Sequence, residues 1–155
     1  MATKDQCAFF ETLFKEESTR ESSLNTYAST LLSLLTLYSG FVVFLADHRK
    51  FEVPSGKYLF AVTVYLMLAG FLATIWGRRI AAYEALNDPD DIIDQFGSAP
   101  LSDEEFFDNR IADYAVATER NRLVNDKKAK WLQYATYCLG LGILMHATFF
   151  MFTVF

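Results

Sequence analysis

The chain has 155 residues, of which 52% are hydrophobic and 15 are phenylalanine, and its formal net charge is -5. This length corresponds to one domain. The acidic balance leaves no clustered basic surface of the kind that nucleic acids require, so we expect no nucleic-acid partner. Cys7 and Cys138 lie far apart and form no CxxC or Cys/His spacing, so the sequence predicts neither a disulfide framework nor a metal site.

Residues 1–21 predict a helix outside the membrane, because four apolar side chains recur at helical spacing: Phe9, Phe10, Leu13 and Phe14. Residues 22–46 are then free of Lys and Glu and exceed the roughly 20 residues that a membrane-spanning helix needs. This segment is too long, and begins too late, for a cleaved signal peptide. No Pro or Gly separates it from the leader, so we expect one helix from about residue 4 to residue 46.

A second apolar segment, residues 58–77, follows a short polar loop at residues 47–57. The run Pro54-Ser55-Gly56 predicts a turn in that loop, so the two spans should form an antiparallel hairpin. The second helix is expected to continue to about Leu86, before the break at Asn87-Asp88-Pro89. Asp88 can cap a short helix that Gly97 closes.

The segment 78–130 predicts further cytosolic helices and leads into a third span at residues 131–155. Ser102 and Glu105 have the spacing of a capping box, and no helix breaker follows before Gly140, so the last helix should enter the membrane unbroken. Gly140 and Gly142 suggest close contact with another helix.

The basic residues predict the orientation. Of the 14 lysines and arginines, 11 lie in the leader and the middle segment, on the same side of a three-span topology. This places the N-terminus in the cytosol and the C-terminus outside, across an inner (plasma) membrane. Trp76 and Trp131 fall at the cytosolic ends of their spans, where indole rings favour the interface. The expected fold is an all-α membrane protein with three transmembrane helices, helical cytosolic extensions and a homo-oligomeric assembly.

The first span carries a stripe of small and polar residues on one helix face: Asn25, Ser29, Ser33, Thr36 and Gly40. Such residues let membrane helices approach closely and hydrogen-bond. In an oligomer the same stripe could line a hydrated pore, with Glu17 and Glu21 at its cytosolic mouth. Packing and pore lining both remain open interpretations.

Polar residues near the cytosolic interface form a second candidate site: Arg78, Arg79, Asn121, Asn125 and Lys128. The basic residues there, with Lys127 and Lys130, suit anionic headgroups or an anionic ligand. Two asparagines one turn apart disfavour a helix, which indicates inter-helix hydrogen bonds or contacts with a ligand or soluble partner. His146, inside the third span, suits either a bond to a neighbouring helix or a proton or metal site. The dense acidic residues of 88–94 and 103–108 suit solvated helix starts or a divalent metal.

Two motifs carry a family resemblance. Residues 16–24 read EESTRESSL, and residues 114–122 read YAVATERNR, followed by NDKKA at 125–129 and then Trp131 and Leu132. In this arrangement the chain resembles small bacterial and archaeal membrane proteins, and is similar in layout to the SLATT-type membrane effectors of nucleotide-signalling antiphage systems. The resemblance implies a membrane part that oligomerises and perturbs the membrane, and it brings no catalytic residues.

The sequence contains no GxGxxG, GxxxxGK[ST], HExxH or GxSxG motif, so we expect neither an enzyme nor a cofactor. The expected function is a non-enzymatic oligomeric membrane effector or pore-forming protein. One alternative is a membrane anchor or scaffold that docks a soluble cytosolic partner through its helical stalks. Another is an accessory subunit of an enzyme.

Overall fold

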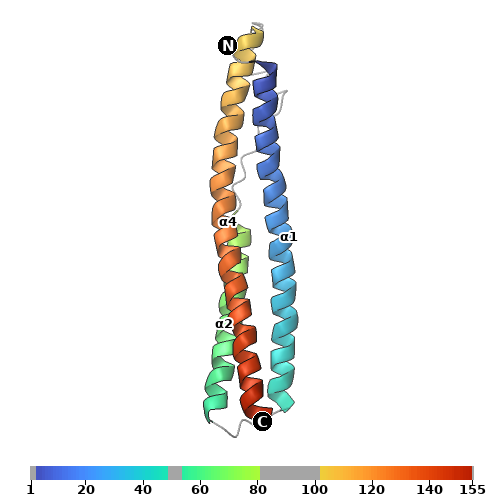
Figure 1. Cartoon of the computed structure of the whole chain (residues 1–155), viewed down its shortest axis with the longest axis vertical. Helices are drawn as coiled ribbons and strands as arrows, with labels where there is room; N and C mark the ends of the chain where they lie inside the picture. Colours follow the sequence, from blue (N-terminus) through green and yellow to red (C-terminus); the bar gives the residue numbers. More distant parts are fainter. Residues whose placement is uncertain (1–2, 49–53, 81–101, 155) are drawn as a thin grey trace. The chain divides into compact units, whose positions relative to one another are not determined.

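The computed structural model describes residues 3–48, 54–80 and 102–154, and every element in these ranges is an α-helix (Figure 1). Helix α1 spans Lys4–His48, α2 spans Pro54–Arg79 and α4 spans Asp103–Val154. Each of the three is long and apolar enough to cross a membrane. The predicted all-α class and the three membrane-length helices are therefore confirmed.

Both long helices begin with reciprocal side-chain caps. The Ser102 amide donates to Oε2 of Glu105 over 3.2 Å, and the Glu105 amide donates to Oγ of Ser102 over 3.3 Å. Thr3 and Gln6 form the same arrangement at the start of α1, at 3.0 and 3.3 Å. The first cap is the predicted capping box, and the second was not anticipated. In each case two amides that the helix leaves free are satisfied locally.

Two predicted boundaries of the second helix were wrong. The run Pro54-Ser55-Gly56 is not a turn, because these residues are the first three of α2. Proline suits the first helical position, since its fixed φ is helical and its missing N–H would have no partner there. The second helix was also expected to continue to about Leu86. Instead, α2 ends at Arg79, and Ile80 is not helical. The predicted short helix between Asp88 and Gly97 lies outside the described residues.

The chain divides into two compact units. Unit 1 comprises Met1–Ser23 with Ala81–Asp126, and unit 2 comprises Leu24–Ile80 with Lys127–Phe155.

In the described part of unit 1, α1 and α4 run in the same direction (Figure 1). The rings of Phe14 and Tyr114 lie 5.8 Å apart, and further along both helices Arg20 contacts Asp126. Five of the partly buried α1 residues of this unit recur at alternating steps of three and four, namely Cys7, Phe10, Phe14, Glu17 and Glu21, and the other three, Glu11, Leu13 and Arg20, lie beside them. This 3.5-residue period is the one that coiled coils use for their contact face.

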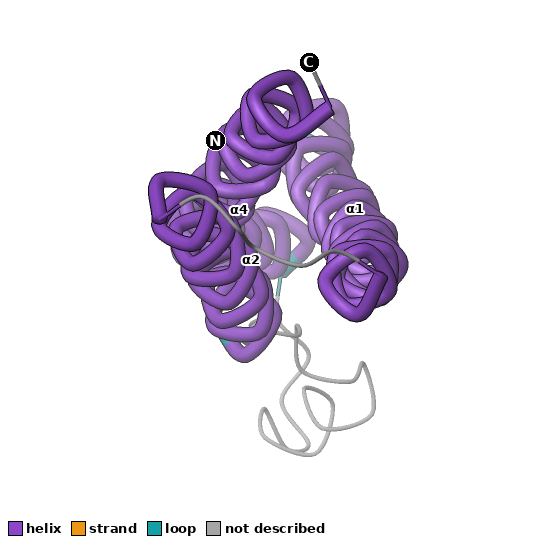
Figure 2. Tube along the Cα trace, turned by 90° about the horizontal axis from the view of Figure 1, so that it is seen from below, coloured by secondary structure: helices purple, strands orange, loops and turns teal. Residues whose placement is uncertain are grey.

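Unit 2 is a three-helix bundle, in which the helix ends seen from below form a triangle rather than a layer (Figure 2). Helix α4 runs parallel to α1 and antiparallel to α2. The predicted antiparallel hairpin of the first two spans is present. The core of the bundle contains Ala28, Leu31, Leu35, Met67, Ala73, Leu132, Ala135 and Leu139.

A regular buried seam runs along α4 in unit 2, again in steps of four and three: Lys128, Leu132, Ala135, Leu139, Gly142, His146 and Phe149. The matching seam of α2 contains Thr63, Met67, Gly70, Thr74 and Gly77. A Cβ added at Gly77 would lie 3.1 Å from Cβ of Trp131, and one added at Gly70 would lie 3.3 Å from Cβ of Cys138. Small residues on α2 therefore allow it to pack closely against α4.

Candidate functional site

The polar stripe of the first span lies mostly on the surface of unit 2. Ser29, Ser33, Thr36 and Gly40 are exposed, and a Cβ added at Gly40 would meet no atom within 4 Å. The buried face of the same helix carries Ala28, Leu31 and Leu35 instead. The stripe therefore does not pack against another helix of its own chain within the described residues.

The hydroxyls of the stripe hydrogen-bond to their own helix. Ser29 Oγ donates to the Asn25 carbonyl over 3.1 Å, Ser33 Oγ to the Ser29 carbonyl over 3.0 Å, and Thr36 Oγ1 to the Leu32 carbonyl over 2.8 Å. These bonds satisfy the hydroxyl donors without water or a neighbouring helix. The face can consequently meet lipid, water or another copy of the chain without an orphaned donor.

The fifth member of the stripe, Asn25, has a different role. It is partly buried, and its Oδ1 accepts a hydrogen bond from Nζ of Lys128 over 3.0 Å. The Lys128 side chain is only 1% exposed, and burial of an ammonium group is costly unless polar atoms surround it. Lys128 thus joins α4 to α1 inside unit 2. Because Lys128 is buried, it does not lie on the predicted ligand-binding face. Arg78 and Arg79, in contrast, are exposed at the end of α2.

Close helix packing uses glycines that the sequence analysis did not single out. Gly70 and Gly77 of α2 face α4, one heptad apart. Of the two glycines expected at a helix contact, Gly142 packs against the side chain of Met67, but Gly140 is exposed with no atom within 4 Å of an added Cβ. The seven-residue spacing of Thr63, Gly70 and Gly77 was the signal that could have identified the contact face.

In unit 1, Asn125 bonds to Glu17. Its Nδ2 donates to the backbone carbonyl of Glu17 over 3.0 Å and to Oε2 of the same residue over 2.8 Å. Asn121, one turn earlier, is fully buried. The structure therefore uses Asn125 for inter-helix hydrogen bonding, the first of the alternatives that its position suggested.

The bond between Asn125 and Glu17 also affects the prediction that Glu17 and Glu21 line the cytosolic mouth of a pore. The Glu17 side chain is only 15% exposed and is bound by Asn125, so within the chain it does not present a free carboxylate. Glu21 is partly buried as well. Beside them, Arg20 donates to Oδ1 of Asp126 over 2.6 Å, and this hydrogen bond raises the pKa of the guanidinium. Glu17 and Asp126 thus form part of the contact between α1 and α4 in unit 1.

His146 bonds to a neighbouring helix. The Tyr38 hydroxyl lies 2.7 Å from Nδ1 of His146, within a group of rings that includes Phe41, Phe149 and Phe150. Nε2 of His146 is buried without a hydrogen-bond partner among the described residues. Nothing in the sequence pairs His146 with Tyr38 in particular, because the pairing depends on the register between α1 and α4.

Within residues 3–48, 54–80 and 102–154, no three His, Cys, Asp or Glu side chains come together in a way that could hold a metal ion. The acidic residues of 88–94 lie outside these ranges. Cys7 and Cys138 are free thiols. The polar side chains of Asn25, Lys128, Asn125, Tyr38 and His146 form contacts between helices.

No protein-family profile matches this sequence. Comparisons with curated proteins and with solved structures gave no match either.

Proposed function

We propose that this chain is a non-enzymatic membrane effector whose copies associate in the bilayer and open a pore or channel-like path. The observation that carries the proposal is the exposed polar stripe of α1, formed by Ser29, Ser33, Thr36 and Gly40 on a helix long and apolar enough to span a membrane. Residues of this type are favoured where membrane helices meet. Since no helix of the same chain covers the stripe within the described residues, a second copy is the occupant that it fits.

In the proposed assembly, α1 lies innermost and its hydroxyls face a hydrated axis. Their hydrogen bonds to backbone carbonyls leave the oxygen lone pairs available to replace part of an ion's hydration shell. Hydroxyls carry no charge, so the selectivity between ions should be weak. Glu17 has no part in this proposal, because Asn125 already binds its carboxylate.

The proposed setting is the inner membrane, with the N-terminus in the cytosol and the C-terminus outside. The distribution of 11 of the 14 basic residues supports this orientation. The resemblance to SLATT-type effectors adds a biological role, the perturbation of the membrane during antiphage defence. Protection of a bacterial host against phage infection, lost when Ser33 is replaced by Leu, would support that role.

The test is ion flux from liposomes that contain the purified protein. Ser33→Leu and Gly40→Leu add bulk to the stripe and should reduce both the flux and the oligomer size by at least several-fold, since overfilling a close contact disrupts it. Ala61→Leu is the matched control, because Ala61 is exposed on α2 and lies outside the stripe. It should leave both quantities unchanged. Wild-type flux at the level of empty liposomes under every condition would refute the pore.

A scaffold that docks a soluble partner is the second candidate. Val116 and Leu123, seven residues apart on α4 in unit 1, are each about half exposed, and Phe9 of α1 is more exposed still. Exposed apolar side chains outside a membrane are typical of sites at which a partner protein binds and covers them. In this case Val116→Glu with Leu123→Glu should abolish the cellular phenotype, whereas Ser33→Leu should retain it. The pore proposal predicts the opposite for Ser33→Leu.

A further inference from the structure

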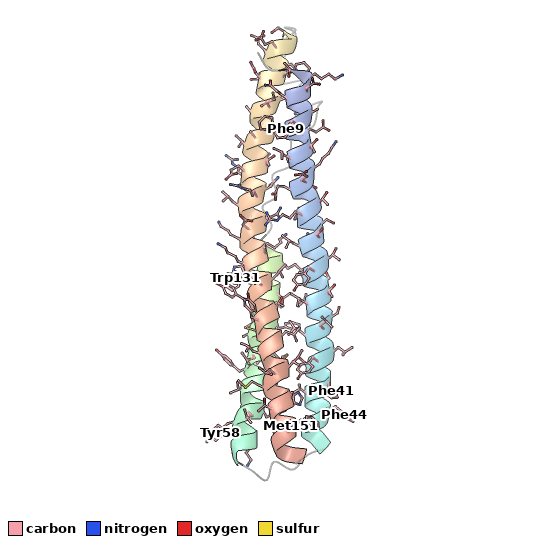
Figure 3. The ribbon with its side chains drawn as sticks, in the orientation of Figure 1. Phe9, Phe41, Phe44, Tyr58, Trp131 and Met151 are labelled. Atoms are coloured by element: carbon pink, nitrogen blue, oxygen red, sulfur yellow. The ribbon has the colours of Figure 1, made fainter. Side chains whose placement is uncertain are left out.

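Both tryptophans of the chain meet on one surface of unit 2. The rings of Trp76 on α2 and Trp131 on α4 have centroids 6.3 Å apart, and Tyr134 lies 6.1 Å beyond Trp131. These side chains are 59%, 39% and 59% exposed, respectively. Figure 3 shows Trp131 directed away from the helix axis, toward the surface. Aromatic rings with one polar group favour the boundary between the hydrocarbon core and the headgroups of a membrane. We therefore expect this surface of unit 2 to lie at that boundary.

Three cationic residues share the face with these rings. Arg79 follows Trp76 by three residues, Lys127 precedes Trp131 by four, and Lys130 precedes Tyr134 by four. Residues at these spacings lie on the same side of a helix. The close contact at Gly77, where an added Cβ would lie 3.1 Å from Cβ of Trp131, holds the two helices together at this level. The rings and cations of α2 and α4 therefore form one surface, which we call the tryptophan surface.

Among the described residues of unit 2, no ion pair compensates the charges of the tryptophan surface. Arg79, Lys127 and Lys130 are exposed and form no ion pair among the described residues. In the described ranges of this unit the only acidic residue is Asp47, at the C-terminal end of α1, whereas the tryptophan surface lies at the C-terminal end of α2. Arg78 differs by one position from Arg79, which places it on another side of α2. Lys128 is buried against Asn25 and does not contribute.

We propose that the tryptophan surface binds an anionic phospholipid, with its headgroup at Arg79, Lys127 and Lys130 and its acyl chains along Trp76, Trp131 and Tyr134. Guanidinium and ammonium groups form charge-assisted hydrogen bonds with phosphate oxygens, and basic residues at the membrane surface attract anionic lipids. The aromatic rings offer apolar contacts to the acyl chains of a lipid. A free phosphate ion has no apolar part that could use these contacts. This inference rests on the membrane-spanning part of the proposed function, but not on the pore.

The experiment uses the intrinsic fluorescence of the full-length protein in phosphatidylcholine vesicles, because Trp76 and Trp131 are the chain's two tryptophans. A fixed small fraction of the lipid carries bromine on its acyl chains, either as phosphatidylglycerol or as phosphatidylcholine. Bromine quenches indole on contact, so the ratio of the two quenching constants measures the preference for the anionic headgroup. With about a fivefold preference per cationic residue near the surface, the ratio should clearly exceed one for the wild type and fall as NaCl is added.

The variant Arg79→Gln/Lys127→Gln/Lys130→Gln should bring the ratio close to one while quenching by brominated phosphatidylcholine persists. The matched control is Lys4→Gln/Lys15→Gln/Arg122→Gln, which removes the same charge from exposed positions of unit 1 and should keep the wild-type ratio. Helical circular dichroism confirms that both triple variants fold, and the wild-type salt titration tests the inference without any variant.

Equal quenching by the two brominated lipids in the wild type would overturn the lipid site while leaving membrane insertion intact. Quenching by neither lipid would overturn membrane insertion together with the lipid site. An equal loss of preference in both triple variants would show general charge attraction rather than a site, and would also refute the inference. Removal of the preference by millimolar inorganic phosphate, at matched ionic strength, would show a phosphate site instead of a lipid site.

Discussion

The hydroxyl of Tyr38 on α1 lies 2.7 Å from Nδ1 of His146 on α4, inside segments that are long and apolar enough to span a membrane. Either atom can donate, depending on the tautomer of the imidazole. The bond joins two parallel helices whose connection passes through the whole of α2. It therefore helps to fix the register of α4 on α1, which neighbouring residues along the chain cannot do.

Loss of this bond should destabilise the bundle. Tyr38→Phe leaves Nδ1 of His146 buried without its partner and should cost on the order of 1 kcal/mol, in the range measured for hydrogen bonds between membrane helices. Thermal unfolding in detergent, followed by circular dichroism, measures the effect. Tyr65→Phe is the control, because Tyr65 is largely exposed, and it should unfold like the wild type. Replacement of both partners, Tyr38→Phe with His146→Phe, should cost less than the sum of the single changes.

A methyl group should have opposite effects at Gly77 and Gly140. Gly77→Ala should destabilise unit 2, because the new Cβ would lie 3.1 Å from Cβ of Trp131 and 3.5 Å from the backbone oxygen of Lys128. Gly140→Ala meets no atom within 4 Å and should stabilise the helix by up to about 1 kcal/mol. Unfolding midpoints of the two variants provide the comparison. Identical midpoints would mean that α2 and α4 do not pack closely at Gly77.

Asn125 should matter more for unit 1 than an exposed asparagine of the same helix. Asn125→Ala removes the donor to the poorly exposed Glu17 carboxylate and should cost about 1–3 kcal/mol. Asn109→Ala is the control, since Asn109 is exposed on α4. Hydrogen–deuterium exchange of residues 10–20 measures the effect locally. Equal exchange in the two variants would contradict a role for Asn125 in joining the helices.

The predicted topology places the two ends of the chain on opposite sides of the membrane. In a variant without Cys7 and Cys138, cysteines introduced singly at Ala2 and at Phe155 should react with a membrane-impermeant maleimide from opposite sides. Inside-out and right-side-out vesicles, labelled in parallel, distinguish the sides. Labelling of both positions from the same side would refute a three-span topology.

Local features of the sequence were sufficient to predict the helices and most of their limits. The unbroken run from residue 4 to beyond residue 40, the capping box at Ser102 and Glu105, and three apolar segments of membrane length all depend on neighbouring residues. Pro54 was misinterpreted because proline followed by serine and glycine is compatible both with a turn and with the first turn of a helix. The choice between these depends on where the preceding helix ends.

The tertiary structure decided which side of each helix is covered. The stripe of Ser29, Ser33 and Thr36 looked like a contact face, but in unit 2 the larger apolar residues Leu31 and Leu35 occupy the core, because burial of apolar surface and close packing favour them. Likewise, the pairing of Glu17 with Asn125 depends on residues more than 100 positions apart. Such pairings follow from the register of α1 on α4, and composition and periodicity along a single helix leave that register undetermined.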